Sequence, residues 1–241
     1  MKSIVTLFFF ILISLLSNPN DMIEQLKTHL QNKEVEKTIS LLEQNPEILD
    51  LKDENGTSAL LLIAYSGLDK AFERAIELKK GFTFHEAIVC GKMDAVKNYL
   101  SVSHTALVNA HSEDGFTPLS LAAFFNQTEI AKLLIDEGAN PNLHAKNPAK
   151  VNALHAAIAK ENYELCTLFI KKGVDVNAVQ TQNVTALHSA VHRGNLNLTK
   201  LLVENGASID LKMDNGDTAL LIAQREGHKN IEEFLTTAKK N

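Results

Sequence analysis

The chain of 241 residues carries a formal net charge of −5, and 45% of its residues are hydrophobic and 22% charged. These proportions are typical of folded globular chains and exclude wholesale disorder. Aromatic residues make up only 6% and tryptophan is absent, which favours small aliphatic side chains between thin helices over one large globular core. Neither the net charge nor any run of residues supplies the concentrated cationic face that phosphate binding requires, so we expect no nucleic-acid partner.

Residues 1–20 have the pattern of a secretory signal peptide. Lys2 precedes an apolar stretch from Ile4 to Leu16, and a polar run follows it. The stretch is shorter than the ~20 apolar residues that span a bilayer. We therefore expect an exported protein, periplasmic or secreted, with no stable membrane span once the leader is removed. The alternatives are an uncleaved anchor, since the cleavage site lacks its usual small residue, and a cytoplasmic protein if translation starts at Met22.

Residues 22–52 follow the leader and are expected to form a helix pair. Apolar side chains recur at helical spacing at Leu26 and Leu30, and again at Ile39 and Leu42. This segment lacks the motif that opens every later unit. We predict that it caps the N-terminal end of an array.

From residue 53 onward, a short motif recurs in register. Its clearest copy is Thr-Pro-Leu-Ser-Leu-Ala-Ala at residues 117–123. The apolar residues that anchor the six copies are Leu60, Phe84, Leu119, Leu154, Leu187 and Leu220. They are 24, 35, 35, 33 and 33 residues apart. A period near 33 that opens with Thr-Pro-Leu-His-x-Ala is typical of ankyrin repeats, and the chain resembles an ankyrin-repeat protein over residues 22–238.

The resemblance implies an all-α fold, an ankyrin-repeat solenoid of helix pairs joined by short β-hairpin loops. We expect the solenoid to occupy residues 21–241. Its parts are an N-terminal cap at 22–52, repeats at about 53–80, 81–109, 110–142, 143–177 and 178–210, and a C-terminal repeat at 211–241. Each helix pair is too thin to bury its own apolar stripe, so neighbouring pairs must cover it.

Local chemistry supports the same boundaries. Thr117 can cap a helix, and Pro118 then takes the first helical position, where no amide hydrogen is needed. Gly138 stands where a left-handed helix end is expected. Glu161 occupies a position that its repeat usually gives to glycine.

Two steps of the array are irregular. The 24-residue step places Gly81 directly after a predicted helix, so we expect the hairpin there to be missing. The second 35-residue step, from Leu119 to Leu154, puts two extra residues into the loop 143–150.

Three histidines, His85, His155 and His188, stand at the histidine of the motif. The resemblance implies a structural role for them, a hydrogen bond to the neighbouring loop. The competing interpretation is a metal-binding or enzymatic protein that uses His188 and His192, which lie four residues apart on one helix. No acidic residue follows His188 and no third ligand is evident, so we expect no metal, no cofactor and no catalytic residue.

The remaining feature is surface. The resemblance implies that partners dock on the concave side, which hairpin tips and the exposed ends of the first helices form. We expect a monomeric, non-enzymatic scaffold that binds another protein there. The predicted contact residues are Tyr65, Phe116, Phe124, Phe125, His192, Arg193, Gln224 and Arg225. Three phenylalanines at one exposed site are costly unless a partner or a neighbouring loop covers them. A structural spacer without a partner is the second alternative.

Overall fold

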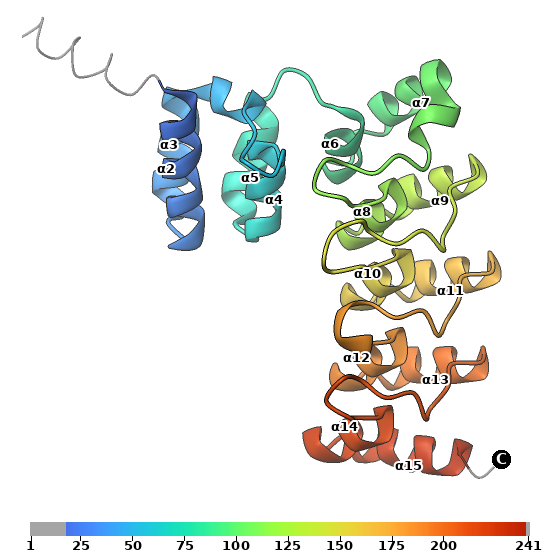
Figure 1. Ribbon diagram of the computed structural model, residues 1–241. Helices are drawn as coiled ribbons and strands as arrows, with labels where there is room; N and C mark the ends of the chain where they lie inside the picture. The colour runs from blue at the N-terminus through green and yellow to red at the C-terminus, as the bar shows by residue number, and fades with distance from the viewer. Residues whose placement is uncertain (1–17, 240–241) are drawn as a thin grey trace, which may run out of the picture. The chain divides into compact units, whose positions relative to one another are not determined.

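The computed structural model describes residues 18–239, without the side chain of His104. Most of the expected leader, residues 1–17, lies outside the described residues. The described chain divides after Glu86 into two compact units, called unit 1 and unit 2 here. Both consist of short antiparallel helices joined by turns (Figure 1).

Unit 1 is built from two helix pairs and a short 3-10 helix. Its elements are α2 (Pro19–Gln31), α3 (Val35–Gln44), η1 (Pro46–Asp50), α4 (Ala59–Ser66) and α5 (Asp69–Leu78). The apolar residues predicted at helical spacing form the core of its first helix pair, since Leu26 and Leu42 have no exposed surface. Leu60, the first motif anchor, is also fully buried.

Unit 2 continues the same construction, and α6 spans the division between the units. Its elements are α6 (Phe84–Val89), α7 (Met93–Leu107), α8 (Pro118–Phe124), α9 (Thr128–Asp136), α10 (Ala153–Ala159), α11 (Tyr163–Lys171), η2 (Thr181–Asn183), α12 (Ala186–His192), α13 (Leu196–Glu204), α14 (Ala219–Glu226) and α15 (Lys229–Ala238). Helices α8, α10, α12 and α14 stack in one layer and α9, α11, α13 and α15 in a second (Figure 1). Leu119, Leu154 and Leu187 are buried in three successive repeats. The core is therefore a row and not a single centre, as the sequence predicted.

Helix starts in unit 2 follow the predicted capping chemistry. The Thr117 hydroxyl accepts the Ser120 N–H at 3.1 Å, and Pro118 is the first helical residue. Asn152 and Thr185 cap α10 and α12 in the same way, each paired with the histidine three residues later. A side-chain cap of this kind contributes about 1 kcal/mol to stability.

A left-handed residue ends the first helix of each pair. Gly194 has a φ of 69° after α12, Asn126 a φ of 58° after α8, and Glu161 a φ of 53° after α10. Glu161 thus adopts the conformation of the glycine that it replaces. Gly138, after α9, has a φ of 87° and confirms the predicted helix end.

The predicted hairpins are present as tight turns with almost no strand. In the described part of the chain, isolated antiparallel β-bridges join Lys52 to Ser58 and Val179 to Thr185. Consecutive turn tips of unit 2 hydrogen-bond to one another through the backbone. The donor and acceptor pairs are Lys146 N–H to Gly115 O at 2.8 Å, Thr181 N–H to Ala149 O at 3.1 Å, and Asp214 N–H to Gln182 O at 3.0 Å. Each repeat is long enough for a turn but too short for extended strands. Backbone hydrogen bonds from the neighbouring repeats hold the turn tips in place.

The 24-residue step lacks its hairpin, as predicted, and a buried polar cluster occupies unit 1 there. Glu86 Oε1 accepts the Ser58 hydroxyl at 2.6 Å and lies 3.5 Å from Lys79 Nζ. Glu86 Oε2 accepts the Thr83 N–H at 2.9 Å. Lys79 Nζ also reaches Asp50 Oδ1 at 2.8 Å. This Glu86 network fixes the residues that lead into α6, in the place of turn hydrogen bonds.

An asparagine at the end of three successive unit-2 repeats ties each of them to the next. Asn142 Oδ1 accepts the Asp175 N–H at 2.7 Å, and Asn142 Nδ2 donates to Gly173 O at 3.0 Å. Asn109 and Asn177 make the equivalent pairs of hydrogen bonds one repeat earlier and one repeat later. This asparagine series fixes the spacing of the stack.

Candidate functional site

The candidate site is the inner face of unit 2, defined here as the C-terminal ends of α8, α10, α12 and α14 together with the turn tips. Seven of the eight predicted contact residues lie in this unit. Tyr65 lies in unit 1, half-buried on α4 beside a shallow pocket of about 350 Å³. The inner face has an aromatic part, a charged part and an apolar pocket.

The aromatic part is formed by α8. The side chain of Phe124 is 38% exposed, and its ring meets that of Phe125 edge-on, with the centroids 5.3 Å apart. Lys160, which directly follows α10, places its Nζ 4.4 Å from the centroid of the Phe124 ring, in cation–π contact. Phe125 and Phe116 are half-buried. Of the three predicted phenylalanines, Phe124 therefore offers the largest exposed fraction.

The charged part is formed by the residues that directly follow α10 and α12. Arg193 Nη1 is 3.9 Å from Glu161 Oε1, the upper limit for an ion pair. Glu161 Oε2 accepts the side-chain amide of Asn195 at 2.7 Å, so that carboxylate is already oriented. Lys160 and Arg193 are both exposed.

The apolar pocket lies between α12 and α14 and has a volume of about 270 Å³. Its lining residues are Val184, His188, Ser189, His192, Met213, Asn215, Asp217, Ile222 and Arg225. Arg225 at this pocket binds Asp217 through Nη1 and Glu226 through Nε. The guanidinium lowers the pKa of Asp217, so that carboxylate stays ionised. Gln224, next to the pocket, donates its amide to Glu232 Oε1 at 3.0 Å.

His188 has the geometry of a structural residue. It is 2% exposed, its Nδ1 accepts the Thr185 N–H at 3.1 Å, and its Nε2 lies 3.0 Å from Leu211 O in the following loop. Both ring nitrogens are engaged, so neither is available to a metal ion. His192, one turn later, is exposed and lies 3.7 Å from Glu226. Among the described side chains, which leave out that of His104, no group of three or more His, Cys, Asp or Glu could hold a metal ion.

The other motif histidines differ from His188. His155 is 4% exposed and its Nε2 has no hydrogen-bond partner among the described residues. Burial, with a contribution from His144, lowers the pKa of His155 to about 4, so the ring is neutral near neutral pH. His85 is half-buried and packs edge-on against Phe84. Thr83 caps the start of α6. Its hydroxyl oxygen accepts the Glu86 N–H at 3.3 Å, and its own N–H donates to Glu86 Oε2 at 2.9 Å.

Cys166 is buried and chemically unreactive. Burial raises the pKa of its thiol to about 12, which keeps it protonated and poorly nucleophilic. Cys90 is half-buried. Of the two cysteines, Cys166 is therefore the one that serves as a small core residue.

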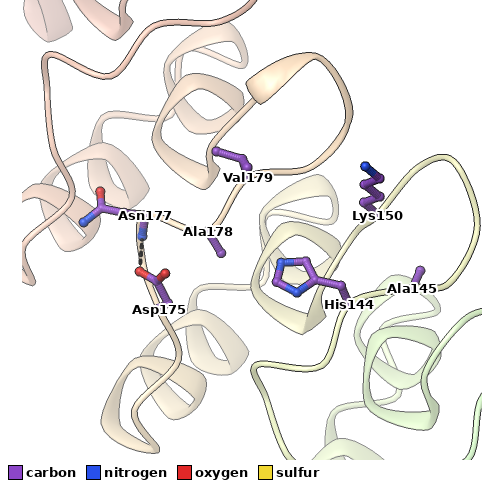
Figure 2. Close-up of a pocket in the computed structure, with 7 residues that line it drawn as sticks. All are labelled: His144, Ala145, Lys150, Asp175, Asn177, Ala178 and Val179. Atoms are coloured by element: carbon purple, nitrogen blue, oxygen red, sulfur yellow. Dashed lines mark hydrogen bonds between the residues drawn. The ribbon is translucent and has the colours of Figure 1, made fainter.

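A second pocket was not predicted from the sequence. Figure 2 shows it between the loop 143–150, which carries the two extra residues, and the loop 175–179. Its volume is about 540 Å³ and it opens widely to solvent. Asp175 on its wall accepts the Asn177 N–H at 2.9 Å, and Lys150 and His144 are exposed opposite (Figure 2).

Stacked helix pairs with one continuous surface of helix ends and turn tips define a solenoid repeat protein. The chain belongs to the ankyrin-repeat family. A family model described as ankyrin repeats in three copies matches residues 17–145, 84–180 and 154–241. Ankyrin repeats generally mediate protein–protein interaction and are typically non-catalytic. Among the described helices, none is both long and apolar enough to cross a membrane.

Individual relatives match only part of the chain. It is 36% identical to an ankyrin repeat protein of fowlpox virus over 97 residues, which are 39% of this chain and 16% of the relative. It is 32% identical to an ankyrin repeat protein of Rickettsia felis over 94 residues, 39% of this chain and 30% of the relative. It is 31% identical to the human transient receptor potential cation channel subfamily A member 1 over 97 residues, 40% of this chain and 8% of the channel. The chain thus spans less than a third of each of these relatives.

Proposed function

We propose that the protein is a non-enzymatic scaffold that binds another protein through the inner face of unit 2. The exposed Phe124 ring carries this proposal. It is packed edge-on by Phe125, lies under Lys160 and sits on a helix end that neighbouring repeats hold in place. A rigid aromatic side chain of this kind is a common hot spot, because it buries much apolar area and loses little conformational entropy on binding.

The surrounding surface supports the proposal because it is organised before any partner arrives. The backbone hydrogen bonds between consecutive turn tips limit the motion of the loops that flank Phe124. The ordering cost of loops, which weakens many interfaces, is therefore small here. His188 serves the same purpose by holding the loop at Leu211 and leaves no vacant ring nitrogen for chemistry.

The test replaces the aromatic pair and measures capture of partners from the compartment in which the protein resides. Phe124→Ala with Phe125→Ala is expected to weaken capture by about 2 kcal/mol or more, roughly 30-fold, with helicity and melting temperature unchanged. Tyr163→Ala is the matched control, since Tyr163 is 51% exposed on α11, outside the inner face. Capture that is equal for the parent and the double variant would refute the assignment of the inner face. No captured protein at all would favour a spacer.

Export is a separate proposal, based on the leader pattern of residues 1–20. N-terminal sequencing of protein recovered from fractionated cells tests it. A start between Asn18 and Met22 in an exported fraction supports export, and a cytosolic protein that starts at Met22 contradicts it.

A further inference from the structure

We infer that the partner segment is acidic and carries an apolar side chain at each end. This inference rests on the proposed function and adds the chemistry and the spacing of the partner. It follows from the order of side chains along the inner face of unit 2. Phe124 and Phe125 come first, the cations Lys160 and Arg193 follow, and the pocket between α12 and α14 comes last.

The two cations are poorly compensated within the chain. Lys160 makes no ion pair among the described residues and has its contact with the Phe124 ring instead. The carboxylate nearest to Arg193 is that of Glu161, at 3.9 Å, and Asn195 already binds its other oxygen. Charged donors that lack a close acceptor favour carboxylates on a partner, since charge-assisted hydrogen bonds are the stronger ones. By contrast, Arg225 is engaged by two acids of its own chain.

The pocket between α12 and α14 suits one apolar side chain. Its volume of about 270 Å³ lies below the ~300–1,000 Å³ of small-molecule sites. Val184, Met213 and Ile222 line it, each from a different segment of the chain. Methionine adapts its shape readily, which suits an aliphatic or aromatic guest.

The stack sets the distance between the two apolar contacts. Packed helices lie ~8–10 Å apart, and the pocket is about two and a half such steps from α8, hence about 20–25 Å away. An extended segment covers this distance with about 6–8 residues, at ~3.3 Å each. A helical segment needs about 13–17 residues, at ~1.5 Å each. The acidic residues should lie between the two apolar side chains.

The experiment selects binders from a display library of random peptides of about 18 residues against the full chain. The enriched sequences are expected to carry aspartate or glutamate between two apolar residues at one of the two spacings. Lys160→Glu with Arg193→Glu should weaken the enriched peptides about 10-fold per cation. Lys160→Gln with Arg193→Gln should weaken them less, and it keeps the test valid if the reversed variant folds poorly by circular dichroism. Lys171→Glu with Lys172→Glu, at the exposed end of α11, is the control of equal charge and should have no effect.

The outcomes separate the two proposals. Peptides that need Phe124 but show no acidic enrichment, or that bind the charge-reversed variant equally well, overturn the inference and leave the proposed function standing. Enrichment of no peptide also overturns the inference, because a linear segment is what it requires. Binding that ignores Phe124→Ala with Phe125→Ala contradicts the proposed function itself.

Discussion

Removal of the Glu86 carboxylate is expected to destabilise unit 1 by about 3–5 kcal/mol, because a buried group with several partners leaves those partners unsatisfied. In Glu86→Ala, the Ser58 hydroxyl loses its acceptor at 2.6 Å and the Thr83 N–H loses its acceptor at 2.9 Å. Ser58 and Glu86 are 8% and 1% exposed, so water does not readily replace the carboxylate.

The size of the effect follows from the individual contacts. Each hydrogen bond to a charged group contributes about 1.5–3 kcal/mol, which gives about 3–6 kcal/mol for two and agrees with the ~3–5 kcal/mol lost when a buried pair is broken. Lys79 adds little to this sum. Its Nζ keeps Leu49 O at 2.7 Å and Asp50 Oδ1 at 2.8 Å after the glutamate is gone. Glu86→Gln retains an acceptor for Ser58 but presents an amide donor to Thr83, so about half of the loss is expected.

Urea unfolding followed by far-UV circular dichroism measures the total change in free energy of unfolding. Because stacked repeats can unfold in parts, hydrogen exchange over residues 50–90 localises it. Glu129→Ala is the control, since Glu129 is 74% exposed and loss of its solvent-screened ion pair with Lys132 should change the free energy of unfolding little. A loss below about 1 kcal/mol for Glu86→Ala, or faster exchange outside unit 1 only, would refute the reasoning.

Further predictions concern unit 2. His155 has a folded pKa of about 4 against about 6.5 when unfolded, so its contribution is complete above pH ~6.5 and is lost as the pH falls towards about 4. The loss is about 3 kcal/mol, and the pH dependence of urea midpoints should be flatter in His155→Gln. Asn142→Ala removes two hydrogen bonds between repeats and should cost about 1–2 kcal/mol by urea unfolding, with Asn140→Ala as the comparison. Gly115→Ala should cost about 2 kcal/mol or more in melting experiments, because φ is 87° and the new Cβ would lie 3.0 Å from the Asn147 N atom. An unchanged melting temperature for Gly115→Ala would contradict the close packing of Gly115 against Asn147 at the turn tips.

The repeats were predictable because their signals are local. Two adjacent residues, Thr117 and Pro118, indicate a helix start, and the single residue Gly138 indicates a helix end. Even Glu161 was identified as a substituted glycine position from its register alone, and its φ of 53° agrees. Patterns of this kind depend only on residues that are close in the sequence, so they can be recognised in a single sequence.

Features that depend on distant residues were not predictable. The Glu86 network joins Ser58, Lys79 and Glu86 across nearly 30 residues, and no short pattern indicates that meeting. The three predicted phenylalanines look alike in the sequence, yet the rotation of α8 exposes Phe124 and half-buries Phe125. His155 and His188 share a motif, but only His188 reaches a carbonyl of the following loop with its Nε2 among the described hydrogen bonds.

The hydrogen bonds between turn tips have a kinetic consequence. The turn tips are already hydrogen-bonded to one another, as Lys146 is to Gly115 and Asp214 to Gln182. Binding of a partner therefore requires no prior folding of these loops. Encounter should therefore be fast and similar for many partners, and complexes should differ mainly in how long they last. Evolution can then change the lifetime of a complex by single exchanges at helix ends, while the framework that presents them stays the same.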